Sequence, residues 1–112
     1  MVNLHYKLCF YVPTENAEQV KQAVFDTGAG RQGNYEQCCW QTIGQGQFKP
    51  IEGADPAIGS VGSLERVEEV KVEVLCEASV IKAAVRALLQ SHPYEEPAFD
   101  VLQLTDHRNW LD

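Results

Sequence analysis

Residues 92–100, HPYEEPAFD, form the segment of this sequence that is richest in side chains able to do chemistry. The imidazole of His92 can bind a proton or a metal near neutral pH, and Glu95 and Glu96 add hard oxygen donors close by. One imidazole and two carboxylates form a donor set suited to zinc, copper, manganese or iron. We therefore take His92, Glu95 and Glu96 as candidate metal ligands, with a divalent metal as the candidate cofactor.

Two prolines restrict how these side chains can meet. Pro93 moves His92 out of helical geometry, and Pro97 keeps Glu96 extended. Neighbouring residues of an extended chain point to opposite sides, so we expect at most one of the two glutamates to join His92 in a single site. The alternative is that His92 caps the carbonyls of a preceding helix while the glutamates meet solvent or arginines.

The segments that must position this motif alternate between strand and helix patterns. Strand-like alternation of apolar residues marks the N-terminal segment and two later ones, and apolar residues at helical spacing mark two others. In chain order we predict a strand ending at Pro13, a helix from about residue 17 to Gly28, strands over about residues 35–48 and 67–76, a helix from Ile81 that ends before Pro93, and a strand over about residues 99–104.

This order of elements predicts an α+β fold, the ferredoxin-like βαββαβ sandwich, with a four-stranded antiparallel sheet and both helices on one face. A length of 112 residues fits one domain, which we expect to span residues 1–112. The sheet face left bare by the helices carries aromatic, cysteine and leucine side chains, so we expect a homo-oligomer. The long loop over residues 50–62 is a further candidate for function.

Composition argues against several classes of function. A net charge of −7 disfavours nucleic acid as a partner, because such binding needs lysine and arginine to displace counterions. No apolar run reaches the ~20 residues of a membrane helix, and the N-terminus lacks the pattern of a signal peptide, so we expect a cytoplasmic protein with no membrane partner. Cys38 and Cys39 on one strand would point to opposite faces, which argues against a shared metal.

A glycine-rich segment is a further candidate site. GAGRQG, residues 28–33, matches a dinucleotide-binding pattern, but it follows a helix and leads into a strand, which is the inverse of the required context. Its amides, with Arg31 beside them, could still contact an anion. No serine or cysteine nucleophile has a visible base beside it. The sequence therefore favours a protein that is not an enzyme.

Four segments together resemble a known family. GAGRQGNYEQC, GQGQFKP, IGSVGSLERVEEVKVE and HPYEEPAFD are similar to the insertion domain of the NGG-interacting-factor-like dinuclear-metal-centre family, the GTP cyclohydrolase I type 2 homologues. The chain looks like a stand-alone version of that domain. The family's dinuclear metal is held by lobes that flank this domain, so the resemblance transfers none of those ligands. HPYEEP also resembles an element of the CutA divalent-cation-tolerance proteins.

CutA and the PII signal transducers share the ferredoxin-like fold and form trimers, so the resemblance implies a trimeric, regulatory module. We expect it to bind a small molecule or a metal in a cleft between subunits. The alternatives are a purely structural or interaction protein and, less favoured, a small-substrate hydrolase. The predicted ligand-binding residues are Arg31, Asn34, Tyr35, His92, Tyr94, Glu95 and Glu96.

Overall fold

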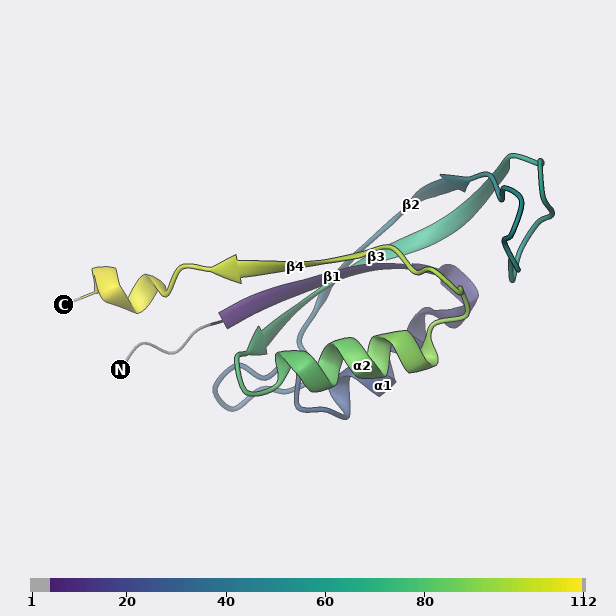
Figure 1. Cartoon of the computed structure of the whole chain (residues 1–112). Coiled ribbons are helices and arrows are strands. Elements are labelled where there is room, and N and C mark those ends of the chain that lie inside the picture. The colour runs from purple at the N-terminus through teal and green to yellow at the C-terminus, as the bar shows by residue number, and fades with distance from the viewer. Residues whose placement is uncertain (1–4, 112) are drawn as a thin grey trace.

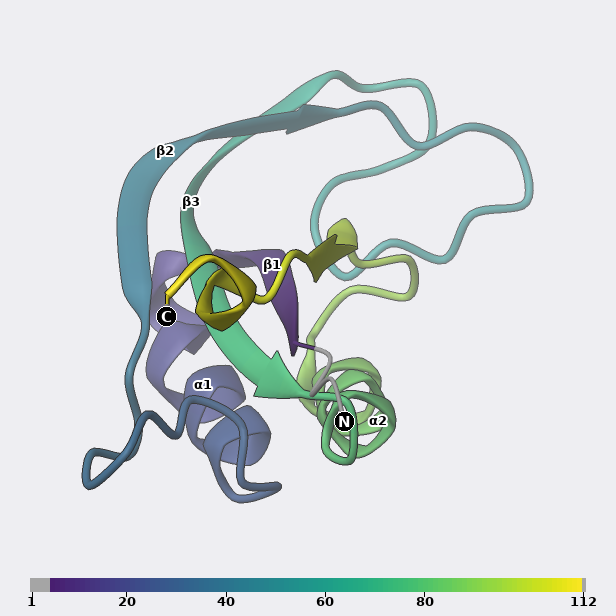
Figure 2. The same ribbon diagram turned by 90° about the vertical axis from the view of Figure 1, so that its left-hand side faces the viewer.

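The computed structural model describes residues 5–111 as a sheet with two α-helices packed beneath it (Figure 1). The elements are β1 (His5–Pro13), the 3₁₀ helix η1 (Thr14–Asn16), α1 (Ala17–Phe25), β2 (Trp40–Phe48), β3 (Glu65–Glu77), α2 (Ile81–Ser91), β4 (Phe99–Leu104) and the 3₁₀ helix η2 (His107–Trp110). The sheet has four strands in the order β2-β3-β1-β4, and every neighbouring pair is antiparallel. Both α-helices cover the same face, as Figure 2 shows. The predicted α+β, ferredoxin-like sandwich is confirmed.

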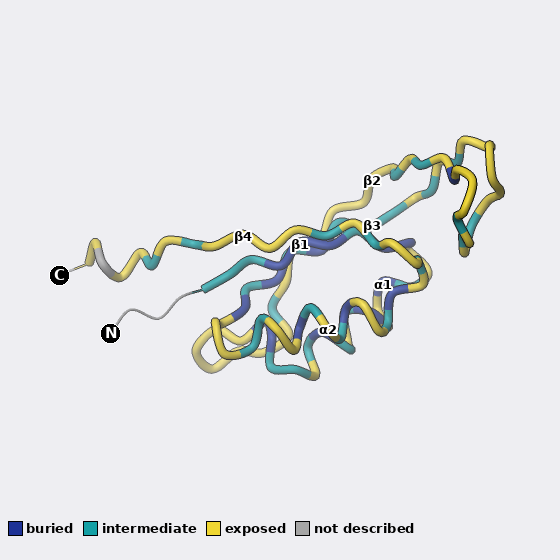
Figure 3. The backbone as a smooth tube through the Cα atoms, in the orientation of Figure 1, coloured by how far each residue is buried: buried dark blue, intermediate teal, exposed yellow. Residues whose placement is uncertain are grey.

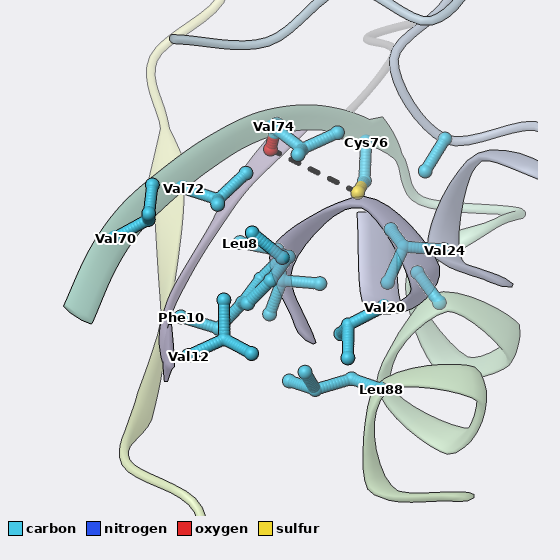
Figure 4. Packing of buried hydrophobic residues seen from close by; sticks show 13 residues of the cluster. Leu8, Phe10, Val12, Val20, Val24, Val70, Val72, Val74, Cys76 and Leu88 are labelled. Atoms are coloured by element: carbon cyan, nitrogen blue, oxygen red, sulfur yellow. Dashed lines mark hydrogen bonds between the residues drawn. The ribbon is translucent and has the colours of Figure 1, made fainter. Parts of the chain in front are cut away.

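The core lies between the two central strands and the helices. Opposite each other across β1 and β3 lie Leu8 and Val74, Phe10 and Val72, and Val12 and Val70. All six are fully buried or nearly so, and Val20, Val24 and Leu88 of the helices pack against them (Figure 4). Burying one such side chain contributes about 1.5–3 kcal/mol of stability. The burial of alternate residues of β1 and β3 is therefore the main reason that the sheet and helices stay together.

The molecule is longer than a compact domain of its size. Its radius of gyration is 15.8 Å and its principal extents are 56 × 23 × 22 Å, against about 13 Å expected for roughly 100 residues. The hairpin of β2 and β3 projects beyond the helices at one end, and β4 with η2 projects at the other (Figure 3). Large apolar side chains that are exposed on the outer strands, on the loop between β2 and β3 and at the C-terminal end include Ile43, Ile51, Val61, Leu64, Val101, Leu102, Trp110 and Leu111.

The second strand begins later than predicted. We expected it from about residue 35, but β2 starts at Trp40, and residues 26–39 form a loop. Gly30, Gly33 and Gln37 adopt positive φ angles there, which breaks the extended backbone. Cys38 and Cys39 therefore precede the strand instead of lying on it. Within residues 5–111, no helix combines the length and apolar character needed to cross a membrane.

Candidate functional site

The end of α2 follows the geometry that its prolines dictate. His92 takes extended backbone (φ −71°, ψ 138°) immediately before Pro93, which stops the helix at Ser91. The His92 amide still donates to the carbonyl of Leu88 at 2.9 Å, so the last turn is closed. Residues 92–97 then form a rigid corner that leads into β4, and we call this segment the α2–β4 corner.

The His92 side chain lies inside this corner, with only 7% of the residue exposed. Its Nδ1 accepts a hydrogen bond from the Tyr94 amide at 3.1 Å, which places the proton on Nε2. Nε2 donates that proton to the carbonyl of Tyr11 in β1, at 2.7 Å. Burial lowers the pKa of His92, although the bond to Tyr11 and the charge of Glu69 act in the opposite direction. The neutral imidazole thus fastens the corner to β1.

Tyr94 makes a second attachment, to the β2–β3 hairpin. Its hydroxyl donates to Oε2 of Glu69 at 3.0 Å, and its ring lies 5.7 Å from that of Phe48. Burial and the Glu69 carboxylate raise the pKa of Tyr94, so the hydroxyl keeps its proton. Glu69 Oε1 lies over Gly46, where a Cβ atom would overlap with it. The glycine leaves room for the carboxylate that holds Tyr94.

Glu95 attaches the corner to the long loop. Its Oε1 accepts a hydrogen bond from the Asp55 amide at 2.8 Å, across 40 positions of sequence. Between corner and loop lies a hollow of about 190 Å³, which we call the corner hollow. It is lined by Phe48, Lys49, Pro50, Ala54, Pro56, Ala57, Ile58, Tyr94, Glu95 and Glu96. Apolar walls with one cation and two carboxylates suit a small organic group with a polar end.

The other predicted residues lie elsewhere. Arg31, Asn34 and Tyr35 belong to the loop between α1 and β2, which is at the opposite end of the sheet from the corner (Figure 1). All three are exposed, and the Arg31 guanidinium lies 3.6 Å from the Glu36 carboxylate. One chain therefore brings Tyr94, Glu95 and Glu96 to one hollow, but it does not bring the Arg31 group to them.

The predicted metal ligands do not converge. Both ring nitrogens of His92 already take part in hydrogen bonds, and Glu95 holds the Asp55 amide. Among residues 5–111, no three or more His, Cys, Asp or Glu side chains are grouped so that they could hold a metal ion. This geometry gives the metal interpretation no support, and metal binding stays a prediction.

Sequence reasoning missed the residues that attach the corner. Glu69 lies in the predicted strand over residues 67–76 and is not among the predicted site residues, yet it is the acceptor for Tyr94. Tyr11, 81 positions from His92, could not be connected to it by any spacing rule. The one available signal was Gly46, because a glycine within a strand often marks the close approach of another group.

Known proteins resemble this chain over most of its length. A Mycobacterium tuberculosis protein named GTP cyclohydrolase 1 type 2 homolog is 51% identical over 98 residues, which is 88% of this chain and 26% of that protein. The chain is homologous to one segment of these proteins. It spans about a quarter of the length of the curated relatives that it matches. No protein-family model matches the chain.

Solved structures agree on both relationship and fold. A Bacillus cereus protein related to NIF3 superposes with a TM-score of 0.81 at 40% identity, covering 95% of this chain and 27% of that one. The divalent cation tolerance protein CutA of Archaeoglobus fulgidus superposes with a TM-score of 0.65 at 14% identity, covering 91% of this chain and 85% of its own. Bacillus subtilis GlnK, solved with ATP, superposes with a TM-score of 0.59 at 11% identity, covering 90% of this chain and 82% of its own. The predicted relationship and the CutA-like and GlnK-like fold are therefore confirmed.

Proposed function

We propose that this chain is a homo-oligomeric module that binds a small ligand at the corner hollow and serves regulation instead of catalysis. The observation that carries the proposal is the hollow itself, because the sequence motif and the long loop meet there. The hydrogen bond between Glu95 and the Asp55 amide joins the two walls. A ligand that touches both walls would therefore order the loop relative to the sheet.

The size of the hollow limits what it can hold. Its volume of about 190 Å³ is below the range of about 300–1,000 Å³ that is usual for ligand pockets. It has room for one ring or aliphatic group against Phe48 and Tyr94, with polar substituents near Lys49, Glu95 and Glu96. The remainder of a larger ligand must lie in solvent or under a second copy of the chain.

A second copy would also explain the separation of the predicted residues. Arg31, Asn34 and Tyr35 are at the far end of the same chain, so only a neighbouring copy could add them to the corner hollow. The two outer strands, β2 and β4, are mostly exposed, and exposed apolar side chains lie on both projecting ends. These features favour a closed homo-oligomer, and we propose a trimer.

The state of the side chains favours binding over catalysis. A general acid or base needs a titratable group within reach of a substrate proton. Here His92 is buried and donates to a carbonyl, and Tyr94 is held protonated by Glu69. Both groups are engaged in maintaining the corner, so neither is placed to exchange a proton with a ligand.

Thermal unfolding with a panel of ligands tests the proposal. The panel contains zinc, copper, manganese, ATP, GTP and small metabolites, because GlnK was solved with ATP and a metal stays a prediction. A ligand at 100 times its dissociation constant should add about 2.7 kcal/mol of stability. If no member of the panel shifts the transition, the binding proposal fails.

Two matched variants locate the binding site. Ala54 lines the hollow, so Ala54→Leu should fill it and abolish the ligand-induced shift. Val61 is in the same loop and is exposed, so Val61→Leu adds bulk outside the hollow and should leave the shift intact. Equal shifts in both variants would place the ligand elsewhere. Light scattering that finds a monomer at micromolar concentration would remove the oligomeric part of the proposal.

A further inference from the structure

A second hollow, of about 370 Å³, lies at the start of β2. It is on the sheet face that the helices leave bare, because Lys7, Glu73 and Leu75 alternate with core residues of β1 and β3 and line it. Cys38 and Cys39 both contribute to its wall. Both cysteines are free, Cys39 is exposed and Cys38 is half-buried. Two adjacent free cysteines therefore line one accessible hollow.

Cys38 and Cys39 belong to a loop that is hydrogen-bonded to the edge of the sheet. Gln37 has a positive φ of 59°, so the chain is not extended as it reaches Cys38. The Cys38 amide donates to the Gly30 carbonyl at 2.9 Å, and the Gly30 amide donates to Leu75 at 2.8 Å. A Cβ atom at Gly30 would come within 2.8 Å of the Cys38 carbonyl oxygen, so the two segments are in close contact. The backbone at Cys38 is thus held against the edge of the sheet.

We propose that Cys38 and Cys39 form a dithiol site that captures a soft, thiophilic centre of low coordination number, with trivalent arsenic as the representative ligand. Thiolates prefer soft centres, and two of them satisfy a centre that already carries one other substituent. The absence of a third donor group among the described residues fits such a centre better than a tetrahedral metal. The site is separate from the corner hollow and does not depend on it.

The reaction with phenylarsine oxide balances without an oxidant. Two arsenic–sulfur bonds form, the arsenic–oxygen bond breaks, and the oxygen leaves as water with the two thiol protons. Arsenic stays trivalent and both sulfurs stay reduced. The second bond forms within one molecule, and linking two binding events in this way strengthens the complex by about 10²–10⁴-fold over a single thiol.

The two remaining cysteines provide an internal contrast. Cys9 is 4% exposed and Cys76 is 1% exposed, each on a central strand. Burial raises the pKa of Cys9, and it raises the pKa of Cys76 to about 11. Because the thiolate is the reactive form, these two thiols should remain unmodified under conditions in which the exposed pair reacts.

Intact mass measurement of the full chain with one equivalent of phenylarsine oxide tests the site. We expect one arsenical per chain and the loss of two titratable thiols. The adduct should survive excess 2-mercaptoethanol and be reversed by 2,3-dimercaptopropanol, because only a dithiol competes with a chelate.

Variants assign the adduct to its cysteines. Cys38→Ser and Cys39→Ser should each weaken capture by about 100-fold or more, and circular dichroism confirms that the fold is retained. Cys39 is exposed, so Cys39→Ser should disturb the fold less than Cys38→Ser does. Cys9→Ala should capture the arsenical as the native chain does. An adduct that 2-mercaptoethanol removes, or one that persists in the Cys39→Ser variant, overturns the proposal.

Discussion

The α2–β4 corner and the loop between α1 and β2 lie at opposite ends of one sheet (Figure 1). They differ in how far their polar side chains are buried and hydrogen-bonded. In the corner, His92 is 7% exposed and both its ring nitrogens are hydrogen-bonded. In the loop, the Arg31 side chain is 68% exposed and has one ion pair at 3.6 Å. Buried polar groups with partners determine backbone position, whereas exposed ones remain accessible to a ligand or a second chain.

The largest test of this contrast compares His92→Ala with Arg31→Ala. Removing the imidazole leaves the Tyr11 carbonyl and the Tyr94 amide without their partner, so we expect a loss of about 2–4 kcal/mol. Removing the exposed guanidinium should change stability by less than about 0.5 kcal/mol. Urea unfolding at one protein concentration measures both. Equal losses would contradict the distinction between the two regions.

A smaller effect is expected from Gly46→Ala, with Gly44→Ala as its control. A methyl group at position 46 displaces the Glu69 carboxylate, whereas position 44 has nothing within 4 Å. Displacement removes the acceptor of the Tyr94 hydroxyl, which should cost about 1 kcal/mol. In a Tyr94→Phe background the same substitution should cost much less, since the hydrogen bond is already absent. A full cost in that background would mean that Glu69 acts through another contact.

The smallest expected effect is a dependence on pH. Burial holds the pKa of His92 below its ordinary value, so the unfolded chain binds a proton more readily than the folded one. The contribution of His92 to the free energy of unfolding is therefore fully present above the ordinary pKa of about 6.5, and it is lost as the pH falls below that value. Urea unfolding at several pH values should show the decline in the native chain. Subtracting the pH dependence of the His92→Gln variant from that of the native chain isolates the contribution of His92. Identical pH curves for the two proteins would contradict this assignment.

Local geometry was predictable to a large extent. Pro93 required extended backbone at His92, which ends α2, and the structure has it. The alternation in β1 and β3 predicted which of their residues face the helices. The predicted start of β2 was wrong because nothing in the sequence indicates that Gln37 adopts a φ of 59°. That error also misplaced Cys38 and Cys39, which share a hollow.

The sequence by itself determined the order of the elements, the apolar face of each and the stiffness of the corner, because these depend on residues within a few positions of each other. Only the tertiary structure decided the partners of the corner: Tyr11 for His92, Glu69 for Tyr94 and Asp55 for Glu95. These contacts depend on strand register and on the path of a long loop. Neither follows from local spacing, because folding brings together residues whose separation along the chain carries no information about their distance.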